Sequence, residues 1–80
     1  MFENVIPIIQ QVANDRSVPR NIRMKCEESV KILQDDKEDM AVRVNTVISS
    51  MDEISNDPNI PTYTRTQIWN IVSLLESVQK

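Results

Sequence analysis

The chain has 80 residues, of which 40% are hydrophobic, and its formal net charge at pH 7 is −3. It contains no histidine and no glycine, and Cys26 is its one cysteine. These counts fit one small domain and exclude Ser-His and Cys-His catalytic pairs, the usual zinc ligand sets, glycine-rich phosphate loops and an internal disulfide. The deficit of Lys and Arg disfavours nucleic acid as a partner.

Apolar residues recur at helical spacing in four stretches, and none of these stretches alternates like a strand. In chain order the apolar positions are Phe2, Val5, Ile6, Ile9, Val12 and Ala13; Ile22, Cys26, Val30 and Leu33; Met40, Val44, Val47, Met51 and Ile54; and Ile68, Ile71, Val72, Leu75 and Val78. They predict helices near residues 3–13, 18–34, 40–55 and 61–78. Because the turns between them are short, we expect an all-α fold, an antiparallel up-and-down four-helix bundle.

The second half of the chain repeats the first at an offset of 42 residues. The matched pairs include Asn14 with Asn56, Asp15 with Asp57, Pro19 with Pro61, Arg23 with Arg65, Val30 with Val72, and Leu33 with Leu75. Apolar spacing and turn residues repeat together, whereas no reactive group does. The sequence therefore predicts one domain, residues 1–80, built from two similar helical hairpins (residues 1–37 and 43–79).

The turns must form without glycine. Asn14 and Asn56 stand where the first and third helices end, and we expect them to take the left-handed conformation that glycine usually supplies. Ser17 and Asn59 are suited to capping the following helices.

An aspartate precedes an arginine by eight residues at each turn. The pairs are Asp15 with Arg23, Asp35 with Arg43, and Asp57 with Arg65. We interpret each arginine as a clamp that reaches back to the aspartate or to the last carbonyls of the preceding helix. The alternative, an anion site built from all three guanidinium groups, conflicts with turns at alternating ends of a bundle.

Other polar groups admit a structural and a functional interpretation. Arg16, Arg20, Arg23 and Lys25 form a basic cluster that is either a solvated helix end or a contact for an anion, an acidic partner or RNA. The acidic run of residues 35–39 lacks the ligand spacing of a calcium loop, so we expect no metal site there. Cys26 lies on an apolar stripe and is predicted to be a buried structural thiol.

The two halves differ most in the last helix. Tyr63, Trp69 and Ile71 occupy the positions that Asn21, Glu27 and Ser29 hold in the first half. Either the last helix is more deeply enclosed by its own bundle, or these three residues form a surface for a partner or a second copy.

Residues 14–23 (NDRSVPRNIR) and 53–76 (EISNDPNIPTYTRTQIWNIVSLLE) resemble an archaeal group, uncharacterised protein family 0147. The resemblance spans nearly the whole chain, and its paired ND-x-x-[VI]-P signature is unusual. It implies an archaeal source and a compact four-helix fold. The family has no assigned activity, cofactor or functional residue, so no catalytic role is implied.

Three hypotheses for function follow. We expect first a protein-interaction module, self-associating or binding another protein, and second a weak RNA-associated accessory that uses the basic cluster. A small carboxylate-based enzyme comes last, because the composition favours no enzymatic activity and no cofactor. The N-terminus shows neither a signal peptide nor a membrane span, so we expect a cytoplasmic protein with no membrane partner.

Overall fold

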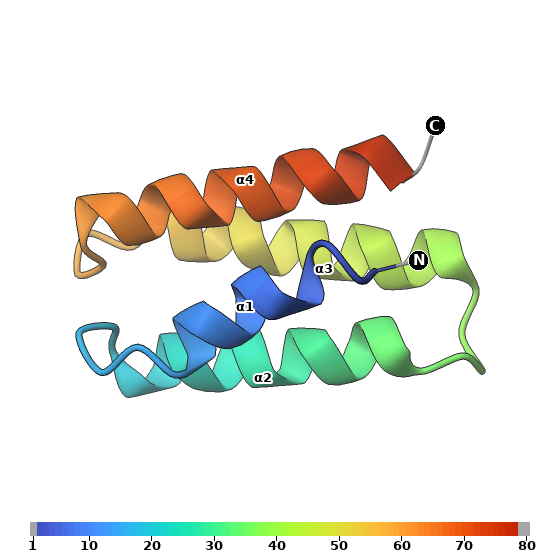
Figure 1. The fold of residues 1–80 in the computed structure, drawn as a ribbon, viewed down its shortest axis with the longest axis horizontal. Coiled ribbons are helices and arrows are strands. Elements are labelled where there is room, and N and C mark those ends of the chain that lie inside the picture. Colours follow the sequence, from blue (N-terminus) through green and yellow to red (C-terminus); the bar gives the residue numbers. More distant parts are fainter. Residues whose placement is uncertain (1, 79–80) are drawn as a thin grey trace.

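The computed structural model describes residues 2–78, which form four helices and no strand. The helices are α1 (Ile6–Ala13), α2 (Arg20–Gln34), α3 (Met40–Ser55) and α4 (Thr62–Val78). Successive helices run antiparallel in an up-and-down bundle (Figure 1). The predicted fold is confirmed, and every predicted helix boundary lies within three residues of the observed one.

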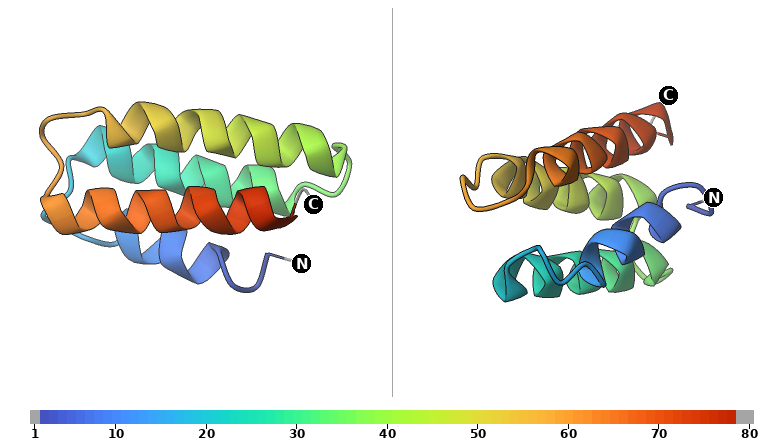
Figure 2. Two further views of the ribbon diagram at one scale, coloured as in Figure 1. Left: turned by 90° about the horizontal axis from the view of Figure 1, so that it is seen from above. Right: turned by 60° about the vertical axis from the view of Figure 1, so that its left-hand side comes forward.

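The turns at residues 14–19 and 56–61 lie at one end of the bundle, and the turn at residues 35–39 lies at the other (Figure 1). Each helix packs against two others, so α1 contacts α2 and α4, and α3 contacts the same two helices (Figure 2). The shortest helix is α1, with 8 residues against 15 to 17 in the others. Pro7 lies in its first turn, where a missing N–H is tolerated. No helix among the described residues combines the length and apolar character needed to cross a bilayer.

Apart from Ala13, the core consists of positions that the 42-residue offset pairs. Both members are buried in the pairs Phe2 and Val44, Val5 and Val47, Ile9 and Met51, Val12 and Ile54, Val18 and Ile60, Ile22 and Thr64, Cys26 and Ile68, Ser29 and Ile71, and Leu33 and Leu75. Each helix therefore turns its apolar stripe inward, and the four stripes meet in one cluster.

The prediction of left-handed helix ends is wrong. Asn14 and Asn56 do end α1 and α3, but their φ angles are −100° and −89°, and no residue between 2 and 78 has a positive φ. Instead an aspartate carboxylate folds each turn by accepting the N–H two residues later. Ser17 donates to Asp15 over 2.9 Å, Lys37 to Asp35 over 3.1 Å, and Asn59 to Asp57 over 2.8 Å. Ser17 and Asn59 are thus donors in these aspartate turns, and no side-chain cap forms on α2.

Two of the three predicted arginine clamps are present, and both bind carbonyl oxygens. Arg43 Nη1 donates to the Leu33 carbonyl over 2.8 Å, while Arg65 donates from Nε to Ser55 over 2.9 Å and from Nη2 to the Asp57 carbonyl over 3.0 Å. Arg23 differs, because it makes no such bond to a carbonyl oxygen among residues 2–78, and its buried Nε, like that of Arg43, has no hydrogen-bond partner. The Arg43 turn lies at the opposite end of the bundle from the other two, so the three guanidinium groups form no common site (Figure 1).

Thr64 is a buried polar residue in the first turn of α4. Its side chain is fully buried, and its hydroxyl has no hydrogen-bond partner. The paired position in the first half holds Ile22, which is apolar and also buried. A buried hydroxyl without a partner lowers stability.

Arg65→Met should lower the free energy of unfolding by about 2 kcal/mol, because methionine keeps most of the apolar stem but leaves two carbonyl oxygens without their charged donor. Arg23→Met is the matched control, since it stands at the paired position and its Nε makes no such bond. Thermal melting should show the larger loss for Arg65→Met. Equal losses would mean that the clamp does not stabilise the turn.

Thr64→Val should raise the free energy of unfolding by roughly 1 kcal/mol, because valine has a similar shape and removes the unpartnered hydroxyl. Thr66→Val is the control at an exposed position of the same helix, where we expect a change within about 0.5 kcal/mol. Urea titration of the three proteins measures both effects. A destabilised Thr64→Val protein would show that the hydroxyl is bonded after all.

Candidate functional site

The three residues proposed as a surface of the last helix do not lie together. Trp69 is 57% exposed and Tyr63 is 56% exposed, whereas Ile71 is fully buried. Assigning Ile71 to a surface was wrong, because it lies three residues after Ile68 and so belongs to the buried stripe of α4. Tyr63 and Trp69 are six positions apart, which places them about 120° apart around the helix. The structure therefore leaves two separate exposed aromatic residues.

Trp69 lies on the outer face of α4. Glu27, at the paired position in the first half, is also exposed, so this position faces solvent in both hairpins. The neighbours of Trp69 along its own helix face are Arg65 and Val72, four residues before and three after it. Val72 is half-buried and packs against the core, so it extends the apolar surface from Trp69 inward. The fold does not require a tryptophan here, which distinguishes this residue from the buried apolar positions.

Tyr63 connects the two turns at one end of the bundle. Its hydroxyl donates to Asp15, which also accepts the Ser17 N–H and the Ser17 hydroxyl, the latter over 2.6 Å. The bonds from Ser17 and Tyr63 lower the pKa of the Asp15 carboxyl, and the same carboxylate raises the pKa of the Tyr63 hydroxyl. Tyr63 therefore has a structural role that its paired residue Asn21 does not share.

The predicted basic cluster is only partly available. Arg16 and Arg20 are exposed, whereas Arg23 is half-buried. Lys25 lies 3.5 Å from Glu53 of α3, so its charge is partly balanced within the fold. The surface that an anion or RNA could meet is thus reduced to Arg16 in the first turn and Arg20 at the start of α2.

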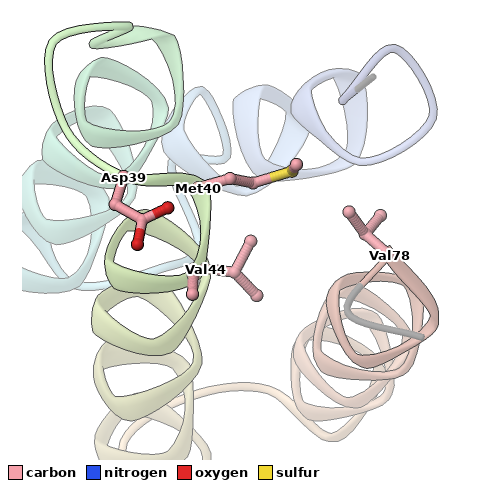
Figure 3. A pocket seen from close by; sticks show the side chains of 5 residues that line it. Asp39, Met40, Val44 and Val78 are labelled. Carbon is pink, nitrogen blue, oxygen red and sulfur yellow. The ribbon is translucent and has the colours of Figure 1, made fainter.

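An apolar hollow of about 460 Å³ opens at the end of the bundle that contains the turn at residues 35–39, and the sequence did not predict it. Met40, Val44 and Val78 point toward one another across the gap between the start of α3 and the end of α4, with Asp39 at the edge (Figure 3). The hollow lies between two helices, so the apolar spacing of any one helix does not specify it. Its lining holds one carboxylate, and no group of three metal-ligating side chains occurs within residues 2–78.

Cys26 is buried in the core, as predicted. Burial, together with the nearby Glu27 carboxylate, raises the pKa of the thiol to about 11. The thiol therefore stays protonated at neutral pH, and it is shielded from reactants.

Comparison with known proteins identifies the family. A model of the Uncharacterised protein family (UPF0147) matches residues 1–78. The UPF0147 protein of Methanothermobacter thermautotrophicus is 53% identical over 79 residues, which are 99% of this chain and 78% of that protein. A crystal structure of a UPF0147 protein from Thermoplasma acidophilum matches with a TM-score of 0.92 at 35% identity, covering 96% of this chain and 91% of that one. A second crystal structure, of a protein of unknown function, matches with a TM-score of 0.90 at 39% identity, covering 99% of this chain and 90% of that one. The resemblance found in the sequence is confirmed, and the chain belongs to the uncharacterised protein family UPF0147.

Proposed function

We propose that this protein is a small cytoplasmic protein-interaction module whose contact surface is the outer face of α4 around Trp69. One observation carries the proposal: the only tryptophan of the chain is 57% exposed. Tryptophan is among the residues most enriched at the centres of protein interfaces, where it contributes much of the binding free energy.

The physical basis is the apolar area that Trp69 leaves in water. A tryptophan side chain buries 150–250 Å² when fully enclosed, so covering its exposed half would stabilise a complex by roughly 2–3 kcal/mol. Val72 adds half-buried apolar surface beside it. The other large exposed apolar residues are Met24 on α2, Val42 on α3 and Tyr63, whose hydroxyl is already bonded to Asp15. Trp69 is therefore the best anchor that the surface offers.

The partner is either a second copy of the chain or a different protein. If two copies pair around a two-fold axis, each Trp69 packs beside the same face of the other copy. The proposal includes no catalytic activity, an expectation that follows from a sequence without histidine or glycine. The RNA alternative predicts salt-sensitive retention on heparin, whereas an apolar contact at Trp69 predicts binding that salt does not weaken.

Trp69→Glu should abolish association while leaving the fold intact. Glutamate is already present at the paired exposed position, Glu27, so we expect a change in unfolding free energy within about 0.5 kcal/mol. Sedimentation equilibrium over a range of protein concentrations measures self-association, and immobilised protein tests for a different partner. The fluorescence of Trp69 also measures its burial directly, because the emission should shift to shorter wavelength when a complex covers the indole ring.

Met24→Glu is the matched control, since Met24 is a similarly exposed apolar residue on α2. It should leave both association and the fluorescence of Trp69 unchanged. If both variants weaken binding equally, or if the fluorescence of Trp69 stays that of an exposed indole in every complex, the contact does not involve this face.

A further inference from the structure

The four helices pack against one another unequally. Contacts within each hairpin, between α1 and α2 and between α3 and α4, are the most extensive, while those between α1 and α4 are the least. The contacts between α2 and α3 are intermediate. Taken together, the two interfaces between the hairpins are about as extensive as the packing within one hairpin, but the α1–α4 part is the least extensive of the four. The seam between α1 and α4 is therefore the place where the hairpins begin to separate most easily.

Polar side chains close the seam between α1 and α4. Gln67 Nε2 donates to Gln11 Oε1 over 3.4 Å, and Tyr63 donates to Asp15. The Gln67 Oε1 atom is buried there without a hydrogen-bond partner. Water can replace both bonds and satisfy that oxygen, so opening the seam costs little in hydrogen bonding. The apolar faces of the two hairpins would still need a new cover.

Only the middle turn lacks a proline. The first turn contains Pro19 and the third contains Pro58 and Pro61, and each of these prolines prevents the flanking helices from joining. The turn at residues 35–39 is Asp-Asp-Lys-Glu-Asp, which contains no such block. This turn is thus the one place where α2 and α3 could continue as a single helix.

The apolar register also continues across this turn. Cys26, Leu33, Met40, Val47 and Ile54 follow one another at intervals of seven residues, with the first two on α2 and the last three on α3. A repeat of seven keeps its residues on one side of a helix. A helix running from Arg20 to Ser55 would therefore present the apolar faces of both hairpins on the same side.

We propose that this chain exchanges hairpins with a second copy of itself, the middle turn straightening so that the α1–α2 hairpin of each copy packs on the α3–α4 hairpin of the other. The exchanged dimer re-forms the contacts between hairpins outside the middle turn, including the bonds of Gln11 with Gln67 and of Asp15 with Tyr63. The Asp35 and Arg43 bonds of the middle turn are replaced by the backbone hydrogen bonds of the continuous helix. The second copy supplies the cover that the opened apolar faces need. Trp69 stays on the outside, so this dimer is independent of the contact proposed above.

Two substitutions of Asp36, in the middle turn at residues 35–39, should change the amount of exchanged dimer in opposite directions. Asp36 is exposed, and Asp35 before it is extended, with φ −83° and ψ 93°, so it is already outside the helical conformation that a following proline disfavours. Asp36→Pro should keep the turn and block the continuous helix, whereas Asp36→Ala favours it. After unfolding and refolding at high concentration, we expect wild type to yield some dimer that persists on dilution. We expect Asp36→Ala to raise the association constant of the dimer about tenfold, because alanine favours the helix more than aspartate does at the straightened turn of each of the two chains. We expect Asp36→Pro to yield monomer with unchanged helix content by circular dichroism.

Cross-linking shows whether the dimer is exchanged. In a Cys26→Ala background, Gln11→Cys with Gln67→Cys places two thiols across the α1–α4 seam. A short bismaleimide should join them within one chain in the monomer and between chains in the dimer, which then runs as a covalent dimer on a denaturing gel. Wild type that refolds only as monomer, a dimer of Asp36→Pro as abundant as that of wild type, or links confined to single chains would each overturn the proposal. Trp69→Glu should leave the exchanged dimer intact, so its result separates this proposal from the surface contact.

Discussion

The absence of glycine is the constraint on which the turns of this bundle depend. A chain that keeps every φ negative from residue 2 to 78 has no left-handed residue with which to end a helix. Three aspartates replace that device, because a carboxylate accepting the N–H two residues later folds the chain with ordinary backbone angles. At two of the three turns an arginine from the next helix then binds the carbonyl oxygens that the ending helix leaves without donors. In this protein, side-chain hydrogen bonds therefore form the turns that glycine residues with positive φ form in many other proteins.

Sequence periodicity predicted the fold because burial in a bundle follows the helical repeat. It predicted the carbonyl clamps as one of two options, and it identified the aspartates as important but assigned them to the arginines. The error about Asn14 and Asn56 arose because asparagine is the usual substitute for glycine, while hydrogen bonding within the turn made a positive φ unnecessary. Trp69 could not be assigned by composition, since a large apolar side chain also suits a small core. Its position directly after Ile68, outside the stripe of α4, was the signal for exposure.

The hollow lined by Met40, Val44 and Val78 shows what helical spacing alone does not contain. All three residues lie on apolar faces, and their spacing is the same whether a neighbouring helix covers them or not. Val44 is fully buried while Met40 and Val78 are half-buried, and the hollow between them depends on how α3 and α4 are placed in the assembled bundle. The unpaired hydroxyl of Thr64 is similar, because it becomes visible only once the neighbouring helices are placed. The local sequence pattern determines the helix face on which a residue lies, whereas the packing of neighbouring helices determines how completely that face is covered.

The difference between Arg23 and Arg65 shows how two similar hairpins become one asymmetric domain. In the second hairpin Arg65 binds two carbonyl oxygens of its own turn. In the first hairpin the Asp15 carboxylate binds Tyr63 of the other hairpin, while Arg23 lies close enough to lower the pKa of Asp15 but leaves its Nε unpartnered. The tyrosine that stands where the first half has Asn21 therefore adds a bond between the hairpins at the first turn. Because that bond lies at the α1–α4 seam, where packing is least extensive, a single aromatic residue supports the weakest of the four helix interfaces.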